Sequence, residues 1–234
     1  MSLTASSRTF VSLLLALAAL AGCESSRPGT RILYADDFQS LDRWVIEAEK
    51  PARVVAQDGA VDIDTPAGLT LWFKPRIEGP VEIESDATAV SAGAANDQAS
   101  DLNVFWMASN RDGSTPFPGQ RSGRFADYND LVTYYVGLGG NRNSTSRFRR
   151  YVGDPVNRPL LPEHDLDTPD AMLVPNQKQT ILLIADRNTI EYKRDGKTLF
   201  RLEDPAPYTG GWFAIRTTWS HLRIERLRIR ARPR

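Results

Sequence analysis

Polar and aromatic residues alternate with apolar ones in several segments of this chain, and the alternation predicts which side chains share a face. In residues 146–152, Phe148 and Val152 mark the buried side of a strand, which places Arg147 and Arg149 on the other side. Such a face would suit an acidic sugar, because aromatic rings can stack on pyranose rings and arginine binds a carboxylate through two parallel hydrogen bonds. The candidate substrate-binding residues on the exposed faces of strands are Trp72, Lys74, Glu84, Arg149, Trp212 and Arg216.

Cleavage of a uronate-containing chain by elimination needs a group that neutralises the carboxylate and a base that removes the neighbouring proton. Asn103 and Arg147 are the candidates for the first role, and Tyr135 or His164 for the second. A tyrosine base needs a lowered pKa, which nearby arginines would supply. His164 lies in a loop between two acidic neighbours that could orient it or hold it charged. These four residues are the predicted catalytic group of a lyase.

Hydrolysis of a glycosidic bond needs two carboxyl groups instead. The segment 81–87 carries three acids at alternate positions, Glu82, Glu84 and Asp86. They would share one face of one strand. The same alternation is typical of any half-exposed strand, so a purely structural role is the alternative.

Composition limits the cofactors and partners that we expect. The chain has 234 residues with 29 basic and 29 acidic side chains, which argues against nucleic acid as a partner. One cysteine and two histidines, without clustered ligands, argue against zinc or copper. We expect no metal and no cofactor. A structural calcium ion stays possible, because several acidic loop residues could bind one, although their spacing does not match an EF-hand. They are Asp112, Asp127, Asp130, Asp165, Asp167 and Asp170.

Strands account for nearly all of the regular structure that the sequence predicts. Asp58-Gly59 and Asp195-Gly196 are turn signals between alternating segments, so we expect a hairpin over 54–64 and a three-stranded meander over 181–202. Helical periodicity is absent outside the N-terminal segment. Two stretches rich in Gly, Pro, Asp and Asn, 110–130 and 153–176, are predicted to be long loops, which are often functional. Further strands are expected at 31–38, 69–74, 81–90, 102–108, 131–138, 146–152, 212–218 and 222–230. Many short strands separated by turns predict an all-β sandwich.

Four segments carry a resemblance to a known family: DLNVFWM at 101–107, YYVGLGGN at 134–141, RFRRY at 147–151 and GWFAIRT at 211–217. They resemble an uncharacterised family of secreted bacterial proteins that is similar in fold to the concanavalin A-like lectins and glucanases and that accompanies polysaccharide-degrading enzymes. The resemblance covers most of residues 32–230. It implies a concanavalin A-like jelly roll of two curved antiparallel sheets, with a ligand bound across the concave sheet.

The N-terminal segment predicts export and lipid attachment. Cys23 follows a basic residue and the apolar run 10–20, which is too short to cross a bilayer. The residues before Cys23 resemble a lipobox, which implies lipidation of its thiol, and Glu24 resembles the residue found in lipoproteins sent to the outer membrane. We therefore expect a signal peptide at 1–22, a lipidated tether at 23–30 and one β-sandwich domain at 31–234, acting as a monomer on the cell envelope.

These observations favour an exported lipoprotein that processes polysaccharide, as a lyase or a glycoside hydrolase, with a polysaccharide or oligosaccharide as its partner. The acids of 82–86 depart from the Glu-x-Asp-x-x-Glu order of laminarinase-type glucanases, which weighs against retaining hydrolysis. Two alternatives stay open: a noncatalytic glycan-binding lipoprotein and a structural component of the envelope.

Overall fold

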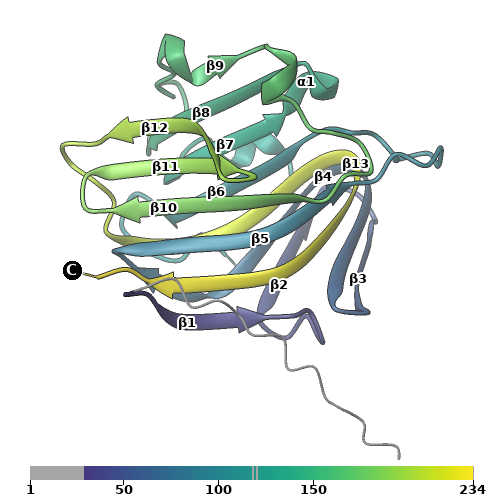
Figure 1. Ribbon diagram of the computed structural model, residues 1–234, viewed down its shortest axis with the longest axis horizontal. Coiled ribbons are helices and arrows are strands. Elements are labelled where there is room, and N and C mark those ends of the chain that lie inside the picture. The colour runs from purple at the N-terminus through teal and green to yellow at the C-terminus, as the bar shows by residue number, and fades with distance from the viewer. Residues whose placement is uncertain (1–28, 118, 120, 234) are drawn as a thin grey trace, which may run out of the picture.

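The computed structural model describes residues 29–117, 119 and 121–233, and they form two layers of antiparallel strands (Figure 1). The strands are β1 (Arg31–Asp36), β2 (Trp44–Ala48), β3 (Arg53–Gln57), β4 (Ala60–Glu78), β5 (Val81–Ala89), β6 (Leu102–Ser109), β7 (Val132–Gly139), β8 (Thr145–Val152), β9 (Asp165–Leu166), β10 (Gln179–Asp186), β11 (Thr189–Arg194), β12 (Lys197–Glu203) and β13 (Gly210–Ala231). Short helical turns lie at η1 (Phe125–Tyr128), α1 (Gly140–Asn143), η2 (Pro162–His164) and η3 (Pro169–Ala171). The predicted all-β class is confirmed.

The two long strands β4 and β13 belong to both layers. The first half of β13 pairs with β4 and β6, and the pairing continues through β7, β8 and β9. We call this layer, with β2 at its edge, the front sheet. The second half of β13 pairs with β5 and β1, and β5 continues to β10, β11 and β12. We call this second layer, with β3 and the start of β4, the back sheet.

The predicted strands at 60–64 and 69–74 are therefore one strand, β4, and those at 212–218 and 222–230 are one strand, β13. Bulges take the place of the loops expected between them, because the register of β13 against β4 shifts between Thr218 and Ser220. The first of the two long predicted loops contains one short 3₁₀ turn, η1, and the second contains η2, η3 and β9.

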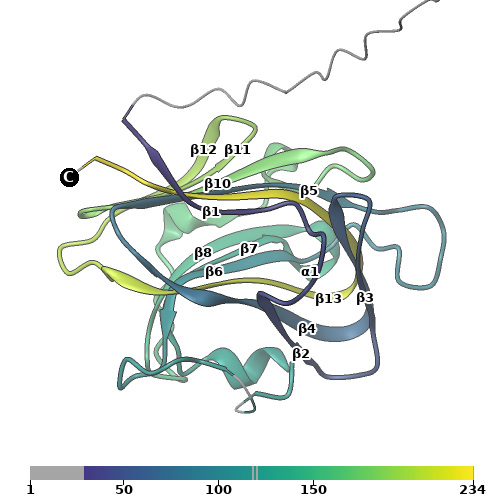
Figure 2. The same cartoon turned by 90° about the horizontal axis from the view of Figure 1, so that it is seen from below.

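The main core fills the space between the sheets. Each sheet contributes every second residue to it, for example Val104, Tyr134 and Phe148 from the front sheet and Ile83, Leu183 and Ile229 from the back sheet. A second, smaller cluster lies on the face of the front sheet turned away from this core, which we call the outer face. Phe117, Tyr128 and Leu131 cover that cluster from the segment between β6 and β7, which runs below the front sheet in Figure 2.

The predicted signal peptide, Cys23 and most of the predicted tether lie outside the described residues. Within the part of the chain that the structure describes, no helix has the length and apolarity needed to cross a membrane.

Candidate functional site

A row of polar residues crosses the outer face of the front sheet. Arg216 on β13 is paired with Thr70 on β4 and with Asn103 on β6. Asn103 is opposite Gly137 on β7, which is opposite Arg147 on β8. Residues paired across antiparallel strands point to the same face, so the register alone brings these side chains together. Positions far apart in the sequence thereby form one line of hydrogen-bonding groups.

Gly137 leaves open the space at the centre of this row. A Cβ atom at Gly137 would lie 2.6 Å from Tyr135 Oη and 3.2 Å from Asn103 Oδ1. Both polar atoms therefore border the point that a side chain would otherwise fill. Asn103 is 3% exposed, and its Oδ1 has no hydrogen-bond partner among the described residues, while its Nδ2 donates to Asp101 Oδ1 at 3.2 Å. A buried acceptor without a partner is costly, and a ligand donor would satisfy it.

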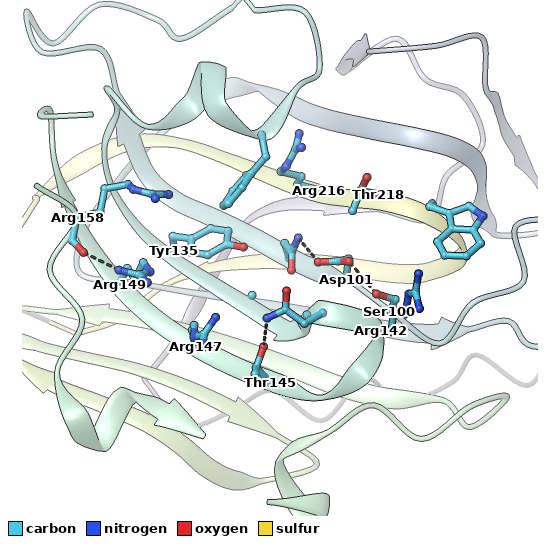
Figure 3. Close-up of a pocket in the computed structure, with 16 residues that line it drawn as sticks. Ser100, Asp101, Tyr135, Arg142, Thr145, Arg147, Arg149, Arg158, Arg216 and Thr218 are labelled. Carbon is cyan, nitrogen blue, oxygen red and sulfur yellow. Dashed lines mark hydrogen bonds between the residues drawn. The ribbon is translucent and has the colours of Figure 1, made fainter. Parts of the chain in front are cut away.

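A cleft of about 520 Å³ opens above this row, within the range of roughly 300–1,000 Å³ usual for ligand sites. Five arginines line it, and Figure 3 shows Arg149 and Arg158 at one end, Arg142 at the other and Tyr135 between them. Among the residues that the structure describes, one of these arginines has a carboxylate partner: Arg147 Nε donates to Asp165 Oδ1 at 2.7 Å. The other four arginines form no ion pair with any carboxylate in the described residues.

The most deeply buried of these cations is Arg216, which is 2% exposed. Its Nη1 donates to Thr70 Oγ1 at 2.9 Å and to the carbonyl of Gly123 at 2.8 Å, so neutral acceptors hold it. The guanidinium also lies over the rings of Phe125 and Tyr128, at 5.1 and 4.8 Å. Burial lowers the pKa of Arg216 from its usual value, as expected for a cation taken out of water.

Asp101 is the only carboxylate that lines the cleft within the described residues. Its burial raises the pKa of the carboxyl, and the hydrogen bonds from Ser100 and Asn103 oppose that rise only in part. Burial, followed by the neighbouring Tyr151 and Asp101, raises the pKa of Tyr135 well above its usual value. The lowered tyrosine pKa expected from nearby arginines is therefore wrong, and Tyr135 is protonated at neutral pH.

Five of the residues predicted from alternation line this one cleft: Asn103, Tyr135, Arg147, Arg149 and Arg216. Several further lining residues were not predicted, because they lie in turns, in loops or at a bulge, where alternation says nothing about direction; they include Ser100, Asp101, Phe125, Arg142, Arg158 and Trp219. Phe125 and Arg158 lie in the two long loops that the sequence predicted from their content of Gly, Pro, Asp and Asn, and this was the one signal for them.

Trp72 and Trp212 lie on the outer face but do not line the cleft. Trp72 is fully buried beneath the segment between β6 and β7, stacked on Phe105 and Phe117, and its Nε1 donates to Glu47 Oε2 at 2.9 Å. Trp212 packs edge-on against Phe117, and its Nε1 donates to the carbonyl of Lys74 at 3.1 Å. The structure therefore does not place these two predicted sugar-stacking rings in the cleft, because the loop covers Trp72 and packs against Trp212.

Three other predicted site residues also lie elsewhere. His164 is buried against Phe148 and Phe200 on the core side of β8, with Nε2 bonded to the carbonyl of Arg201 at 3.0 Å. Glu84 lies on the back sheet, buried beside Arg226. Lys74 donates from Nζ to the carbonyl of Asp42 at 2.6 Å and does not line the cleft. Their assignment to the site is wrong, because His164 and Glu84 lie on other faces and Lys74 bonds the carbonyl of Asp42.

The acids of β5 instead form an ion-pair network on the back sheet. Arg226 bonds both oxygens of Asp86, at 2.9 and 3.0 Å, and pairs with Glu84. Arg232 pairs with Glu82 at 3.2 Å. The structural alternative for the alternating acids is therefore the one that the geometry supports. Among the described residues, no three acidic, histidine or cysteine side chains gather in a way that could hold a metal ion.

Several solved structures have a fold similar to that of this chain. A protein of unknown function with a galectin-like fold from Bacillus subtilis matches with a TM-score of 0.66 at 15% identity, over 86% of this chain and 97% of that one. The carbohydrate-binding module CBM66 from Bacillus subtilis matches with a TM-score of 0.52 at 9% identity, over 78% and 92% of the two chains. An endo-β-1,3-glucanase from Pyrococcus furiosus matches with a TM-score of 0.53 at 9% identity, over 86% and 94%.

These likenesses confirm the predicted resemblance of the fold to concanavalin A-like lectins and glucanases. No curated protein matches the chain. One family model matches residues 63–227, which is more than half of the chain. Its description is "Domain of unknown function (DUF6250)", and the chain belongs to that family.

Proposed function

We propose that this protein binds an anionic saccharide in the arginine-lined cleft of the front sheet. The observation that carries the proposal is the set of four arginines, Arg142, Arg149, Arg158 and Arg216, that line the cleft without an ion-pair partner among the described carboxylates. Arginine is suited to carboxylate and sulfate groups because its planar fork donates two parallel hydrogen bonds. The fold supports a saccharide as the ligand, because its structural neighbours include a carbohydrate-binding module and a glucanase.

Binding is better supported than hydrolysis. A glycosidase needs two carboxyl groups on either side of the scissile bond, and Asp101 alone lines the cleft in the described part of the chain. The nearby Glu47 is buried, and its Oε2 accepts hydrogen bonds from Trp72 and Tyr128 at 2.9 and 2.8 Å beneath the covering segment. Among the described residues, no second acid lines the cleft.

One observation favours elimination as a second candidate function. Asn103 Oδ1 and Tyr135 Oη border the same space above Gly137, next to arginines that could neutralise a uronate carboxylate. In such a reaction Asp101, whose pKa is raised, would take the proton beside the carboxylate. Tyr135 would then donate its proton to the leaving oxygen as the carbon–oxygen bond breaks, giving an unsaturated uronate.

The test combines binding with product detection. The purified protein is titrated by calorimetry with polygalacturonate, alginate and heparin, and with the neutral glucans laminarin and dextran. We expect binding of an acidic polysaccharide that weakens with added salt, no binding of the neutral glucans, and a loss of about tenfold for Arg149→Gln, the size usual for an arginine hot spot. Arg76→Gln, outside the cleft, is the matched control. Equal binding of neutral and acidic glycans would overturn the proposal, and ultraviolet absorbance of an unsaturated product would establish the lyase.

We also propose that the protein works at the cell envelope, exported and held by a lipid on Cys23. The lipobox resemblance before Cys23 and the polar tether after it support this. Fractionation tests it: the protein should partition with outer membranes, and Cys23→Ser should release it from them. Retention of the variant in the membrane fraction would count against a lipid anchor.

A further inference from the structure

The end of the cleft opposite Arg149 is formed by a cation and an aromatic ring from two different elements. Arg142 of α1 lies with its Cζ 5.8 Å from the ring centre of Trp219 on β13, and both line the cleft. Trp219 is 40% exposed despite this contact. Figure 3 shows Arg142 and Thr218 at this end, with Tyr135 and Asp101 between them and the opposite end. The cleft is thus lined by cations at both of its ends.

Arg142 occupies a conformation that an arginine rarely adopts. Asn141, Arg142 and Asn143 have φ values of 53°, 59° and 61°, so the turn between β7 and β8 is left-handed. Asn143 holds it through two hydrogen bonds with the backbone of Leu173, at 2.9 and 2.8 Å. Asparagine tolerates this region, whereas other L-residues lose roughly 1–2 kcal/mol there. A strained residue at a cleft suggests a functional role.

Trp219 is turned toward the cleft by the bulge in β13. Arg216 and Thr218 face the cleft, so regular alternation would direct the next residue to the core, where Thr217 is fully buried. The register shift between Thr218 and Ser220, with φ of 43° at Trp219, places the indole at the rim instead. A left-handed φ is a clear outlier for a bulky side chain. Arg142 and Trp219, two residues with unfavourable backbone conformations, thus lie at the same end of the cleft.

We propose that Arg142 and Trp219 form a second saccharide subsite, so that the ligand is an acidic oligosaccharide of at least two units. The indole would stack on the second ring, and the guanidinium would pair with its anionic group, while the first unit lies over Asn103 and Tyr135. This inference rests on the proposed function and extends it from an acidic sugar to an acidic chain. It predicts that affinity rises with chain length.

The experiment measures affinity against length. Galacturonate, its dimer and its trimer, and the same series of alginate oligosaccharides, are titrated into the wild type, Arg142→Asn and Trp219→Gly. Asn and Gly accept left-handed backbone, so both variants should fold, which thermal unfolding checks. We expect each variant to lose about tenfold in affinity for the trimer, the loss typical of an interface hot spot, and to keep its affinity for the monomer.

Arg76 and Trp212 supply the matched control, since Arg76 Cζ lies 5.6 Å from the Trp212 ring but neither residue lines this cleft. Arg76→Asn and Trp212→Ala should bind every length as the wild type does. Wild-type affinity of Arg142→Asn and Trp219→Gly for the trimer would overturn the second subsite, as would equal losses for monomer and trimer. Failure of the wild type to bind any acidic oligosaccharide would instead overturn the proposed function, and the subsite with it.

Discussion

Within the described residues, Asp101 is the one carboxylate that lines the cleft, and its removal should improve binding. Asp101 Oδ2 accepts from Ser100 Oγ at 2.7 Å, and burial raises the pKa of the carboxyl. When Asp101 is ionised, it repels an anionic ligand. We expect Asp101→Asn to strengthen binding of polygalacturonate at neutral pH by about two- to tenfold, as removal of one nearby like charge should. Calorimetry at low ionic strength measures the change.

The substitution is mild for the backbone, because Asp101 has a φ of 56° and asparagine also accepts left-handed geometry. Asp112→Asn is the control, since Asp112 lies on an exposed loop and does not line the cleft. Weaker binding by Asp101→Asn would mean that the carboxylate itself contacts the ligand. That outcome would contradict its assignment as a repulsive charge and would favour the lyase.

Alternation in the sequence could predict which face a strand residue takes, but it could not predict what covers that face. It placed Asn103, Tyr135 and Arg147 together because their strands are regular at these positions and their apolar partners belong to one core. It failed for Trp72 because a segment distant in sequence folds over that ring. Arg142 and Trp219 could not be found at all, since their directions come from a left-handed turn and a bulge.

At the scale of elements, the segment between β5 and β6, residues 90–101, is held in place by His221, which bonds two carboxylates. His221 on β13 bonds Asp97 Oδ1 through Nδ1 and Asp62 Oδ1 through Nε2, both at 2.9 Å. Burial alone would lower the pKa of His221, but these hydrogen bonds outweigh it and raise the pKa above its usual value. Only the protonated ring can donate to both carboxylates.

His221→Gln should therefore destabilise the protein in a pH-dependent way. A raised folded-state pKa gives stability that is complete below the unfolded pKa and is lost as pH rises through the folded value. We expect the variant to lose roughly 1.5–3 kcal/mol near pH 5.5, as for hydrogen bonds to charged groups, and much less near pH 9. Urea unfolding at both pH values measures the difference. Arg53 and Arg223, which lie 2.9 and 3.8 Å from Asp62, stay in place in both proteins.

The comparison variant is Leu222→Ala, which removes a buried apolar side chain next to His221 and no titratable group. Its loss of stability should be the same at both pH values. An equal loss for His221→Gln at both pH values would contradict the charged bridge and would leave only a packing role for His221.

Most elements could be predicted from turn signals and alternation, but their continuity could not. The hairpin around Asp58-Gly59 and the meander of β10, β11 and β12 follow the expected turns. In β4 and β13, by contrast, the ladder continues through a bulge between segments that the sequence predicted as separate strands. A local pattern cannot distinguish a bulge from a loop, because the difference depends on whether a partner strand continues alongside.

For the whole molecule, the shared strands should make the two sheets unfold together. β4 and β13 each pass through both layers, so neither sheet can separate without breaking a ladder of the other. We expect a single transition in guanidinium, with tryptophan fluorescence and far-ultraviolet circular dichroism giving the same midpoint.

Two matched cavity variants test this further: Leu138→Ala in β7 of the front sheet and Leu183→Ala in β10 of the back sheet, both in the main core. Each should lower the one midpoint, at a cost of about 2–5 kcal/mol, without splitting the transition. If Leu183→Ala shifted only part of the signal and left a second transition at the wild-type midpoint, the sheets would be separate folding units. The cleft, whose base is the front sheet, could then survive the loss of the back one, whereas in a cooperative fold ligand binding should raise the stability of both sheets equally.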